Sequence, residues 1–557
     1  KAAEWLETRG LIDRALLHAN ASGDTEALAR LLARQSENLA HTGRSFSLLR
    51  YAHNIPVELL RDHPDLQLDC VYAATLSWQF NEASRILSDV RATLQNNARM
   101  QRWTEGGFDY PRIERKLIHR EAQLALLKDQ MARAADLAKQ WDQMEGGCTS
   151  FESAVNWTTL IYAQRELFDF SNLDSAPAAR EIFEADGNEW ATIWHDCIIG
   201  ASHMQAGDMN RAQDILNRGF CTAQTLYGPA TPNTAMPALY LAELKYEQDR
   251  TDEASALVDE FLPLATRTGL VDQLIAGFLT QARLAAQSDL DRAFRIFEHG
   301  EEIAGSRQFK RLRYFLLAER LRLIVAAGDY AGARRIASLH GLPRDLEQLS
   351  PHAGMNSSHT AVAMAAAQVA LIDNAPREVE RLLSRWVQFL TMRHCHKLAI
   401  KMSMMLAQAQ LLDGKENPAH RSLRAALQLG CGGFVRSFLD VIPIVSQALS
   451  SMQVEGESDI ARQLASVRRH AAPGTPKVAM KTPPRDAEAE GPCEALNNRE
   501  AEILLLISTG MMNKQIAAEL GLTLGTVKWY LHQIYGKLGV SRRSEAVFRA
   551  RRFGLIA

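Results

Sequence analysis

Between about residue 65 and residue 455, apolar residues recur at spacings of three and four along the chain. This is the period of a helix that buries one face, and the residues that dominate the segment, alanine, leucine, arginine, glutamine and glutamate, favour helix. Strict alternation of apolar and polar residues, which marks a half-buried strand, is scarce. The pattern therefore predicts an all-α body.

The helical pattern repeats about every 40 residues. Four stretches, "QAGDMNRAQDIL", "EQDRTDEASALV", "AAQSDLDRAFRIF" and "AAGDYAGARRI", each end one helix at Gly, Asp or Ser and begin the next with a small residue at a fixed offset. A weaker form of the pattern recurs elsewhere, and one degenerate copy fits around "APREVERLL". This period predicts stacked helical hairpins that form a superhelix with a concave surface, in which the small residues let paired helices approach closely. The small residues are Ala212, Ala254, Ala293 and Ala333, with Ala83, Ala134 and Ala419 in the weaker copies.

Residues 66–455 are thus predicted to form one repeat domain, which resembles a tetratricopeptide-like array. A concave surface of this kind is typical of proteins that bind a peptide, a protein or a small molecule. We expect it to bind an inducer or a regulatory protein, and the alternative is a rigid spacer. Trp190, Trp194 and Tyr240 lie near repeat turns and are candidate ligand contacts, with ordinary packing between repeats as the favoured alternative.

Residues 496–557 have a different pattern, which predicts four short helices. Ile503, Leu504 and Ile507 mark the buried stripe of the first helix, and Ile516 and Ala517 mark that of the second. The second helix stops at a glycine, and a third begins after a tight turn. This arrangement predicts a helix-turn-helix.

In the third of these helices, the side opposite the predicted core carries Lys528, Trp529 and His532. Lysine can reach guanine acceptors in a major groove and tryptophan can contact a thymine methyl, so these three residues are the predicted base-facing positions. Helix N-termini and nearby polar or cationic groups would contact phosphates. The predicted backbone contacts are Asn513, Lys514, Thr523, Thr526, Lys537 and Arg542.

The charge distribution agrees with an anionic partner for the C-terminal region alone. Residues 496–557 hold nine lysines and arginines against four glutamates, a formal charge of +5, whereas the whole chain of 557 residues has −2, which leaves −7 upstream. A short basic domain can also be a merely solvated surface, so the charge supports DNA binding without deciding it.

The C-terminal region resembles the LuxR-type DNA-binding domain through "LxxRE", "GxxNKxIAxxL" and "TVKxxLxxIYxKLGVxxRxxA". By that resemblance, Lys528, Trp529 and His532 fall at base-facing positions, and Lys514 and Thr526 at backbone positions. The chain departs from the family pattern at Asn497, Met512 and Tyr530, where Thr, Ser and His are common.

Residues 1–65 read as helix, glycine turn, helix and a proline-marked break. They resemble the segment that joins an N-terminal nucleotide-binding module to the helical superhelix in large ATP-dependent LuxR-type regulators, of the kind represented by the maltose regulon activator. The resemblance implies an ATP-binding module ahead of residue 1, so ATP is expected there and no cofactor in this chain. The chain lacks an initiator methionine, and we expect it to be the C-terminal portion of a longer protein. The residues that carry the resemblance are Trp5, Gly10, Ala15, His18, Ala19, Gly23 and Asp24.

Residues 456–495 are predicted to be a flexible linker, because four prolines between 473 and 484 and mixed charges cannot bury a core. Such a tether would let the final domain move independently.

Motifs of catalysis and metal binding are missing from the sequence. It contains no GxxxxGK[ST], HExxH or GxSxG, so we expect no enzyme activity in this chain. The stretch "RHCHK" is predicted to be helical, and a spacing of two on a helix would keep His394 and His396 from converging on a metal. The seven cysteines form no CxxC pair. Without a membrane span or signal peptide, the expected location is the cytoplasm, with no membrane partner.

Together these features predict a signal-responsive transcription regulator, more specifically an activator. Its expected partners are double-stranded promoter DNA, a small-molecule inducer or regulatory protein at the superhelix, and RNA polymerase. A single small reader makes few phosphate contacts, so self-association on neighbouring DNA sites is expected to strengthen binding. The main alternative is a repeat-scaffold adaptor for proteins, whose helix-turn-helix does not read sequence. A further alternative is a parent protein that is chiefly a nucleotide hydrolase.

Overall fold

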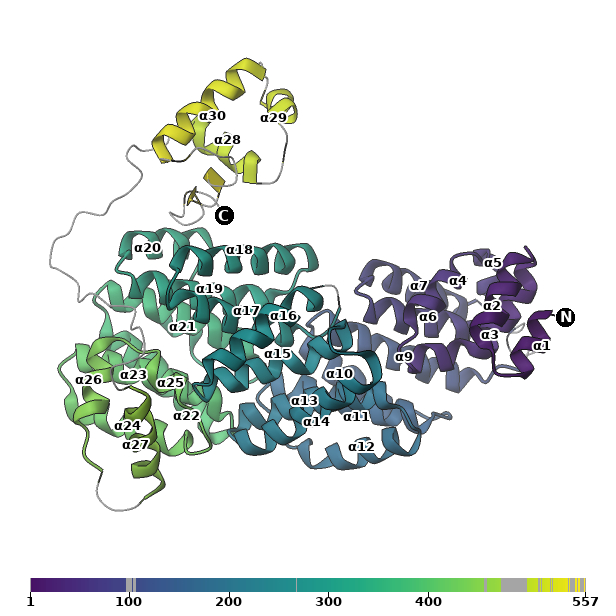
Figure 1. Ribbon diagram of the computed structural model, residues 1–557, viewed down its shortest axis with the longest axis horizontal. Coiled ribbons are helices and arrows are strands. Elements are labelled where there is room, and N and C mark those ends of the chain that lie inside the picture. The colour runs from purple at the N-terminus through teal and green to yellow at the C-terminus, as the bar shows by residue number, and fades with distance from the viewer. Residues whose placement is uncertain are drawn as a thin grey trace.

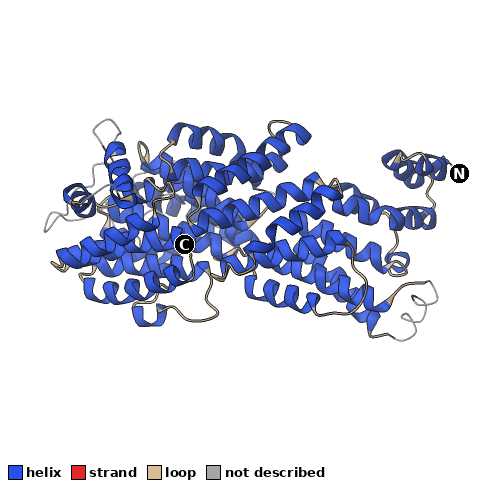
Figure 2. Ribbon diagram, turned by 90° about the horizontal axis from the view of Figure 1, so that it is seen from below, coloured by secondary structure: helices blue, strands red, loops and turns tan. Residues whose placement is uncertain are grey.

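The computed structural model describes residues 2–96, 103, 107–266, 268–454, 458–471, 498–508, 511, 513–520, 522, 524–538, 540, 546–547, 549–550 and 555. Over these residues every regular element is a helix, as Figure 2 shows. The prediction of an all-α chain, with a tetratricopeptide-like region before a helix-turn-helix domain, is confirmed.

Helices α1 to α5 precede the first hairpin of the array (Figure 1). The predicted break near Pro56 and Pro64 falls around the shortest of them, and Pro64 is the first residue of the next helix. The helices are α1 (Ala2–Thr8), α2 (Ile12–Ala21), α3 (Thr25–His41), α4 (Ser45–Ala52) and α5 (Val57–Leu60).

The body is a run of antiparallel helix pairs, each packed on the next. Short 3-10 turns interrupt it at Leu173–Ser175 and Leu346–Leu349. The pairs are α6 (Pro64–Leu76) with α7 (Phe80–Leu94), α9 (Tyr110–Leu127) with α10 (Met131–Asp142), α11 (Ser150–Glu166) with α12 (Ala176–Ala185), α13 (Glu189–Ala206) with α14 (Met209–Tyr227), and α15 (Pro232–Glu247) with α16 (Thr251–Ala265). They continue with α17 (Val271–Ala286) and α18 (Leu290–Arg307), α19 (Lys310–Ala326) and α20 (Tyr330–Leu339), α21 (Ser357–Ile372) and α22 (Pro376–Met392), and α23 (His396–Leu412) and α24 (Glu416–Leu429).

The predicted small residues all occupy the fourth position of the second helix of a pair, and each is fully buried. An alanine there presents only a methyl group, so the first helix of the pair can pack close to it. In α12 the position holds Ala179, which the repeat pattern missed. In α22 it holds Val379, which is also fully buried, and this larger residue explains why the copy at "APREVERLL" looked degenerate.

The two helices of each pair form two layers. First helices such as α15 are buried along nearly their whole length, including the charged residues Glu243, Lys245 and Glu247. Second helices such as α24 bury only one stripe, formed there by Ala419 and Leu423 with their neighbours, and face solvent with the rest. The first helices therefore line the inside of the superhelix and the second helices cover its outside.

The segment after α24 closes the superhelix on itself. It contains α25 (Arg436–Leu439) and packs against the end of α15, where the Val435 amide donates to the Glu247 carbonyl oxygen at 2.7 Å. A Cβ atom on Gly432 would collide with the carbonyl oxygen of Gly207, the left-handed residue that ends α13. Glycine at 432 therefore allows two turns more than 200 residues apart in the sequence to touch.

The predicted linker is wrong over its first part. Two more helices follow the closing segment, α26 (Pro443–Ser451) and α27 (Asp459–His470), and α27 lies inside the range predicted to be flexible. It packs on α24 and buries Leu464 and Val467, because its few apolar residues fall on one face of a short charged helix. Four prolines beyond it dominated the sequence pattern and concealed this helix.

A buried polar cluster joins α6, α9 and α11. Asp69 accepts ion pairs from Lys116 at 2.9 Å and Arg120 at 3.1 Å, and these cations hold the pKa of Asp69 at about 2 although burial works to raise it. Arg120 also donates to Nδ1 of His119, so His119 is neutral and donates from Nε2 to the Glu152 carbonyl oxygen. Both ring nitrogens of His119 are therefore engaged, and a second proton on Nδ1 would displace the hydrogen bond from Arg120.

We expect Ala134→Leu to lower the free energy of unfolding by about 1–3 kcal/mol, because the added carbons would enter a closely packed contact between α9 and α10. Ala132→Leu on the same helix is the matched control: Ala132 is exposed, and its change should stay within about 0.5 kcal/mol. Urea unfolding followed by circular dichroism measures both. Equal stability of the two variants would refute the role of the small residue.

Acid should destabilise the array below about pH 6.5, the ordinary histidine pKa. Burial lowers the pKa of His41 to about 3 and that of His195 to about 4. Between pH 6.5 and about 4, these histidines therefore bind protons in the unfolded chain but not in the folded chain. The stability is therefore full above pH 6.5 and falls by up to about 1.4 kcal/mol per pH unit for each such histidine. Urea unfolding at pH 7.5, 6.5 and 5.5 measures the slope. His195→Gln should flatten it, and a change of the exposed His53 to Gln should leave it as it is.

Candidate functional site

The C-terminal region contains α28 (Asn498–Ser508), α29 (Asn513–Glu519) and α30 (Leu524–Leu538), which pack on one another. Their shared core includes Ile503 and Ile516, as the sequence predicted, together with Val527 and Ile534 of α30. Ala546 and Ala550 of the fourth predicted helix join the same core, although most of that helix lies outside the described residues. The core fixes which side of α30 faces inward.

The predicted base-facing residues all lie in α30. Relative to the buried Val527, positions 528, 529 and 532 lie about 100° to 200° round the helix, away from the core stripe. Their side chains, and those of Lys514, Thr523 and Arg542, lie outside what the structure describes. Of the predicted backbone contacts, Asn513 begins α29 and Thr526 lies in the first turn of α30, both partly buried. The assignment of these residues to DNA stays a prediction.

Lys537 is engaged within the domain. Its Nζ lies 2.9 Å from Oε2 of Glu500, a carboxylate that is only 2% exposed, so the ion pair ties the end of α30 to the start of α28. A lone buried carboxylate is costly, and Lys537 neutralises it. A separation of 37 residues concealed this pairing in the sequence.

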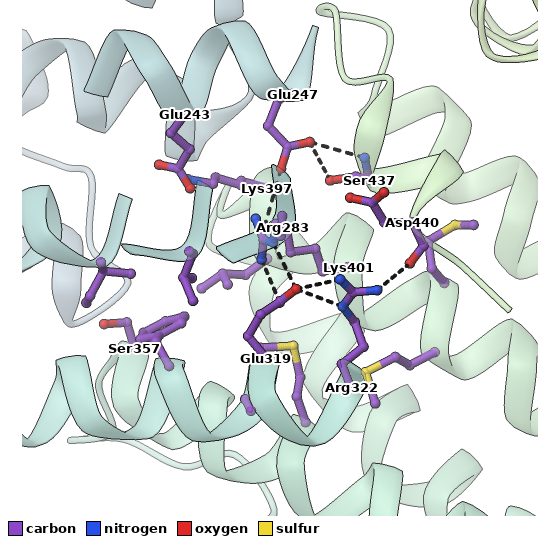
Figure 3. Close-up of a pocket in the computed structure, with 18 of the residues that line it drawn as sticks. Glu243, Glu247, Arg283, Glu319, Arg322, Ser357, Lys397, Lys401, Ser437 and Asp440 are labelled. Carbon is purple, nitrogen blue, oxygen red and sulfur yellow. Dashed lines mark hydrogen bonds and ion pairs between the residues drawn. The ribbon is translucent and has the colours of Figure 1, made fainter. Parts of the chain in front are cut away.

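A second candidate site is a cavity of about 200 Å³ inside the superhelix (Figure 3). Its lining comes only from the inner helices α11, α13, α15, α17, α19, α21 and α23 and from residues 437–445, which run from the closing segment into the first turn of α26. The site thus lies on the inner surface of the array, where the sequence predicted a concave surface.

Charged side chains of both signs line the cavity in equal number. Glu319 accepts two hydrogen bonds from Arg283, at 3.0 and 2.8 Å, and two from Arg322, at 2.8 and 2.6 Å. Burial works to raise the pKa of Glu319, but the two arginines together lower it. The charged lining residues are Arg165, Arg283, Arg311, Arg322, Lys397 and Lys401, with Glu166, Glu243, Glu247, Asp272, Glu319 and Asp440.

The closing segment contributes to the polar wall. The Ser437 hydroxyl and amide both donate to Oε2 of Glu247, at 2.7 and 3.2 Å. Asp440 accepts from the Tyr246 hydroxyl at 2.7 Å and from Arg436 at 2.7 Å. The bonds of Ser437 to Glu247 and of Tyr246 to Asp440 hold residues 437–440 to the end of α15.

Of the three aromatic candidates, one reaches the cavity. Tyr240 lines it and is 1% exposed. Trp190 instead packs on Trp194, with ring centroids 5.5 Å apart, and on the turn at Gly43, where a Cβ atom would collide with its ring. The alternative of packing between repeats is thus the observed one for these two tryptophans.

Sequence reasoning missed the charged residues that line the cavity. A signal was present in stretches such as "LAELKYE", where charged residues interrupt a helix that is apolar on all sides. Which inner helices meet is set by the superhelical turn, which no local pattern carries.

"RHCHK" does not lie within a helix as expected. His394 has a positive φ in the turn before α23, Cys395 precedes that helix and His396 begins it. Among the described residues, no group of three or more histidine, cysteine or acidic side chains is placed to hold a metal ion. Over the same residues, no helix combines the length and the apolar character that crossing a bilayer requires.

Comparison with known proteins gives two family matches. Residues 116–454 match the MalT-like TPR region, and residues 494–550 match the luxR family of bacterial regulatory proteins. The chain is 21% identical to the HTH-type transcriptional regulator AlkS of Pseudomonas putida over 525 residues, which covers 92% of this chain and 56% of AlkS.

Two further relatives match parts of the chain. The serine/threonine-protein kinase PknK of Mycobacterium tuberculosis is 25% identical over 350 residues, or 62% of this chain and 30% of PknK. The transcriptional regulatory protein LiaR of Bacillus subtilis is 35% identical over 130 residues, or 22% of this chain and 61% of LiaR. The chain spans little more than half the length of AlkS.

The first family match covers more than half of the chain, and the second contains the helix-turn-helix. The chain therefore belongs to the family with a MalT-like TPR region and carries a C-terminal domain of the luxR family of bacterial regulatory proteins.

Proposed function

We propose that this chain is the sensing and DNA-reading part of a transcription activator in the bacterial cytoplasm. The observation that carries the proposal is that a luxR-family domain follows a repeat array with a cavity lined by charged and apolar side chains. A small-molecule inducer binds in the cavity, and the C-terminal domain binds promoter DNA through Lys528, Trp529 and His532. The resemblance to AlkS supports the regulatory role.

Residues 437–445 are the proposed connection between the two sites. They form part of the cavity wall, and the chain continues from them through α26 and α27 towards the DNA-binding domain. A ligand that contacts Ser437 or Asp440 changes the hydrogen bonds that hold this segment to α15. Ligand binding thereby alters the anchoring of the helices that precede the linker.

ATP binding on a preceding module, self-association on neighbouring DNA sites and contact with RNA polymerase complete the proposed activator. A regulatory protein on the outside of the array is the second candidate signal, since the outer helices leave their polar faces exposed. In the adaptor alternative the helix-turn-helix does not distinguish DNA sequences, and in the hydrolase alternative the parent protein chiefly turns over ATP.

We expect Lys528→Ala to relax sequence preference at one base position by about 1–3 kcal/mol, because a lysine at a base-facing position discriminates among base pairs. The measurement is binding of the whole chain to a selected operator and to operators with single base changes, at fixed salt. Lys139→Ala, at an exposed position on α10, is the control and should leave the preference intact. Unchanged discrimination by Lys528→Ala would argue for the adaptor.

A further inference from the structure

The size of the cavity bears on what it can hold. Its volume of about 200 Å³ is many times what a single water molecule requires, so a small organic metabolite fits within it.

The carboxylates that line the cavity already have strong donors. Glu243 accepts from Lys397 at 2.7 Å, Glu247 from the Ser437 hydroxyl at 2.7 Å, and Glu319 from two arginines. Glu166 and Arg311 are paired at 2.5 Å. Asp272 and Asp440 likewise accept bonds of 2.9 Å or shorter from the hydroxyls of tyrosines. A cationic ligand would thus have to displace an existing donor.

Two of the cations that line the cavity, Lys401 and Arg283, have more N–H groups than hydrogen-bond partners among the described residues. Among the described residues, the one ion pair of Lys401 is to Glu247 at 3.4 Å, although an ammonium group has three hydrogens to donate. Arg283 donates from Nε and Nη2 to Glu319, which leaves Nη1 without a hydrogen bond in the described part of the chain. Burial and then the neighbouring Arg283 charge lower the pKa of Lys401, so the two cations repel each other although Glu247 acts on both. Figure 3 shows Lys401 and Arg283 facing the same central space.

The remaining wall of the cavity is apolar. Met364 on α21, Met404 and Met405 on α23 and Phe315 on α19 contribute flexible or aromatic surface that adapts to a hydrocarbon. Val441, Ile442 and Val445 extend this surface along the closing segment. The cavity therefore combines two cations that can still donate hydrogen bonds with a wall of apolar side chains.

We propose that the cavity binds a small organic acid whose carboxylate lies between Lys401 and Arg283 and whose apolar body contacts the methionine wall. The inference rests on the proposed function and assigns a chemical class to its inducer. The ligand's carboxylate adds a second anionic partner for each cation, and its oxygens accept from Lys401 Nζ and Arg283 Nη1. The closing segment completes the apolar side, so an acid in this position contacts the segment that leads to the DNA-binding domain.

The test uses three probes of one chain length and different head groups: hexanoate, hexylamine and 1-hexanol. Isothermal titration calorimetry on the whole chain at neutral pH measures their affinities. We expect hexanoate to bind about 10- to 100-fold more tightly than 1-hexanol, because hydrogen bonds to a charged group are the stronger ones, and we expect no binding of hexylamine.

Lys401→Met should weaken hexanoate binding by about 10- to 100-fold and leave 1-hexanol unaffected. Glu247 keeps both bonds from Ser437 in this variant but loses its ion pair with Lys401, so thermal unfolding checks that the variant is folded. Lys401→Arg keeps the charge and should retain most of the affinity. Lys139→Met, the same change at an exposed lysine on α10, is the matched control and should bind like the unaltered chain.

The outcomes separate this inference from the proposed function. Binding of 1-hexanol or hexylamine at least as tight as that of hexanoate overturns the acid but keeps the cavity as an inducer site. Hexanoate affinity that survives Lys401→Met in a folded variant overturns the assigned head-group position. Failure of all three probes to bind overturns the acid as ligand, and DNA reading by the chain is then judged on its own measurement. The head-group comparison on the unaltered chain stands even where a variant fails to fold.

Discussion

The structure depends on the inability of any single hairpin to bury its own first helix. Helices such as α15 are buried on all sides, so each needs its partner outside and neighbouring inner helices beside it. The fully buried alanines at the fourth position of the outer helices allow this close approach. Stacking then propagates along the chain until the segment after α24 meets α15 and closes the inner surface.

Closure explains why the inside of the superhelix is rich in ion pairs. An inner helix that carries charge and is buried on all sides must neutralise that charge locally, since an unpaired buried ion is costly. Arg283, Glu319 and Arg322 do so across α17 and α19, and Lys397 and Glu243 do so across α23 and α15. Lys401 has only the long contact with Glu247, at 3.4 Å, as an ion pair within the described part of the chain. The proposed ligand carboxylate would give this lysine a closer anionic partner.

The fold was largely predictable from the sequence, and the cavity was not. The repeat at Ala212, Ala254, Ala293 and Ala333 is a local signal, because a small residue at a fixed helix position follows from the packing of one pair. The core of the C-terminal domain was predictable for the same reason. Helix α27 was missed because nearby prolines outweighed its short apolar stripe. The Lys537–Glu500 pair and the contact of Lys401 with Glu247 join residues distant in sequence, and only the tertiary arrangement brings them together.

The central claim is that this chain reads DNA sequence. The most direct measurement is to incubate the whole purified chain with fragmented genomic DNA at two salt concentrations and to sequence the fragments that it retains. The account predicts one recurrent motif at both salt concentrations, with weaker overall retention at the higher one because phosphate contacts release counterions. Uniform retention of all fragments that disappears at higher salt would contradict the account, since charge alone would then explain the binding.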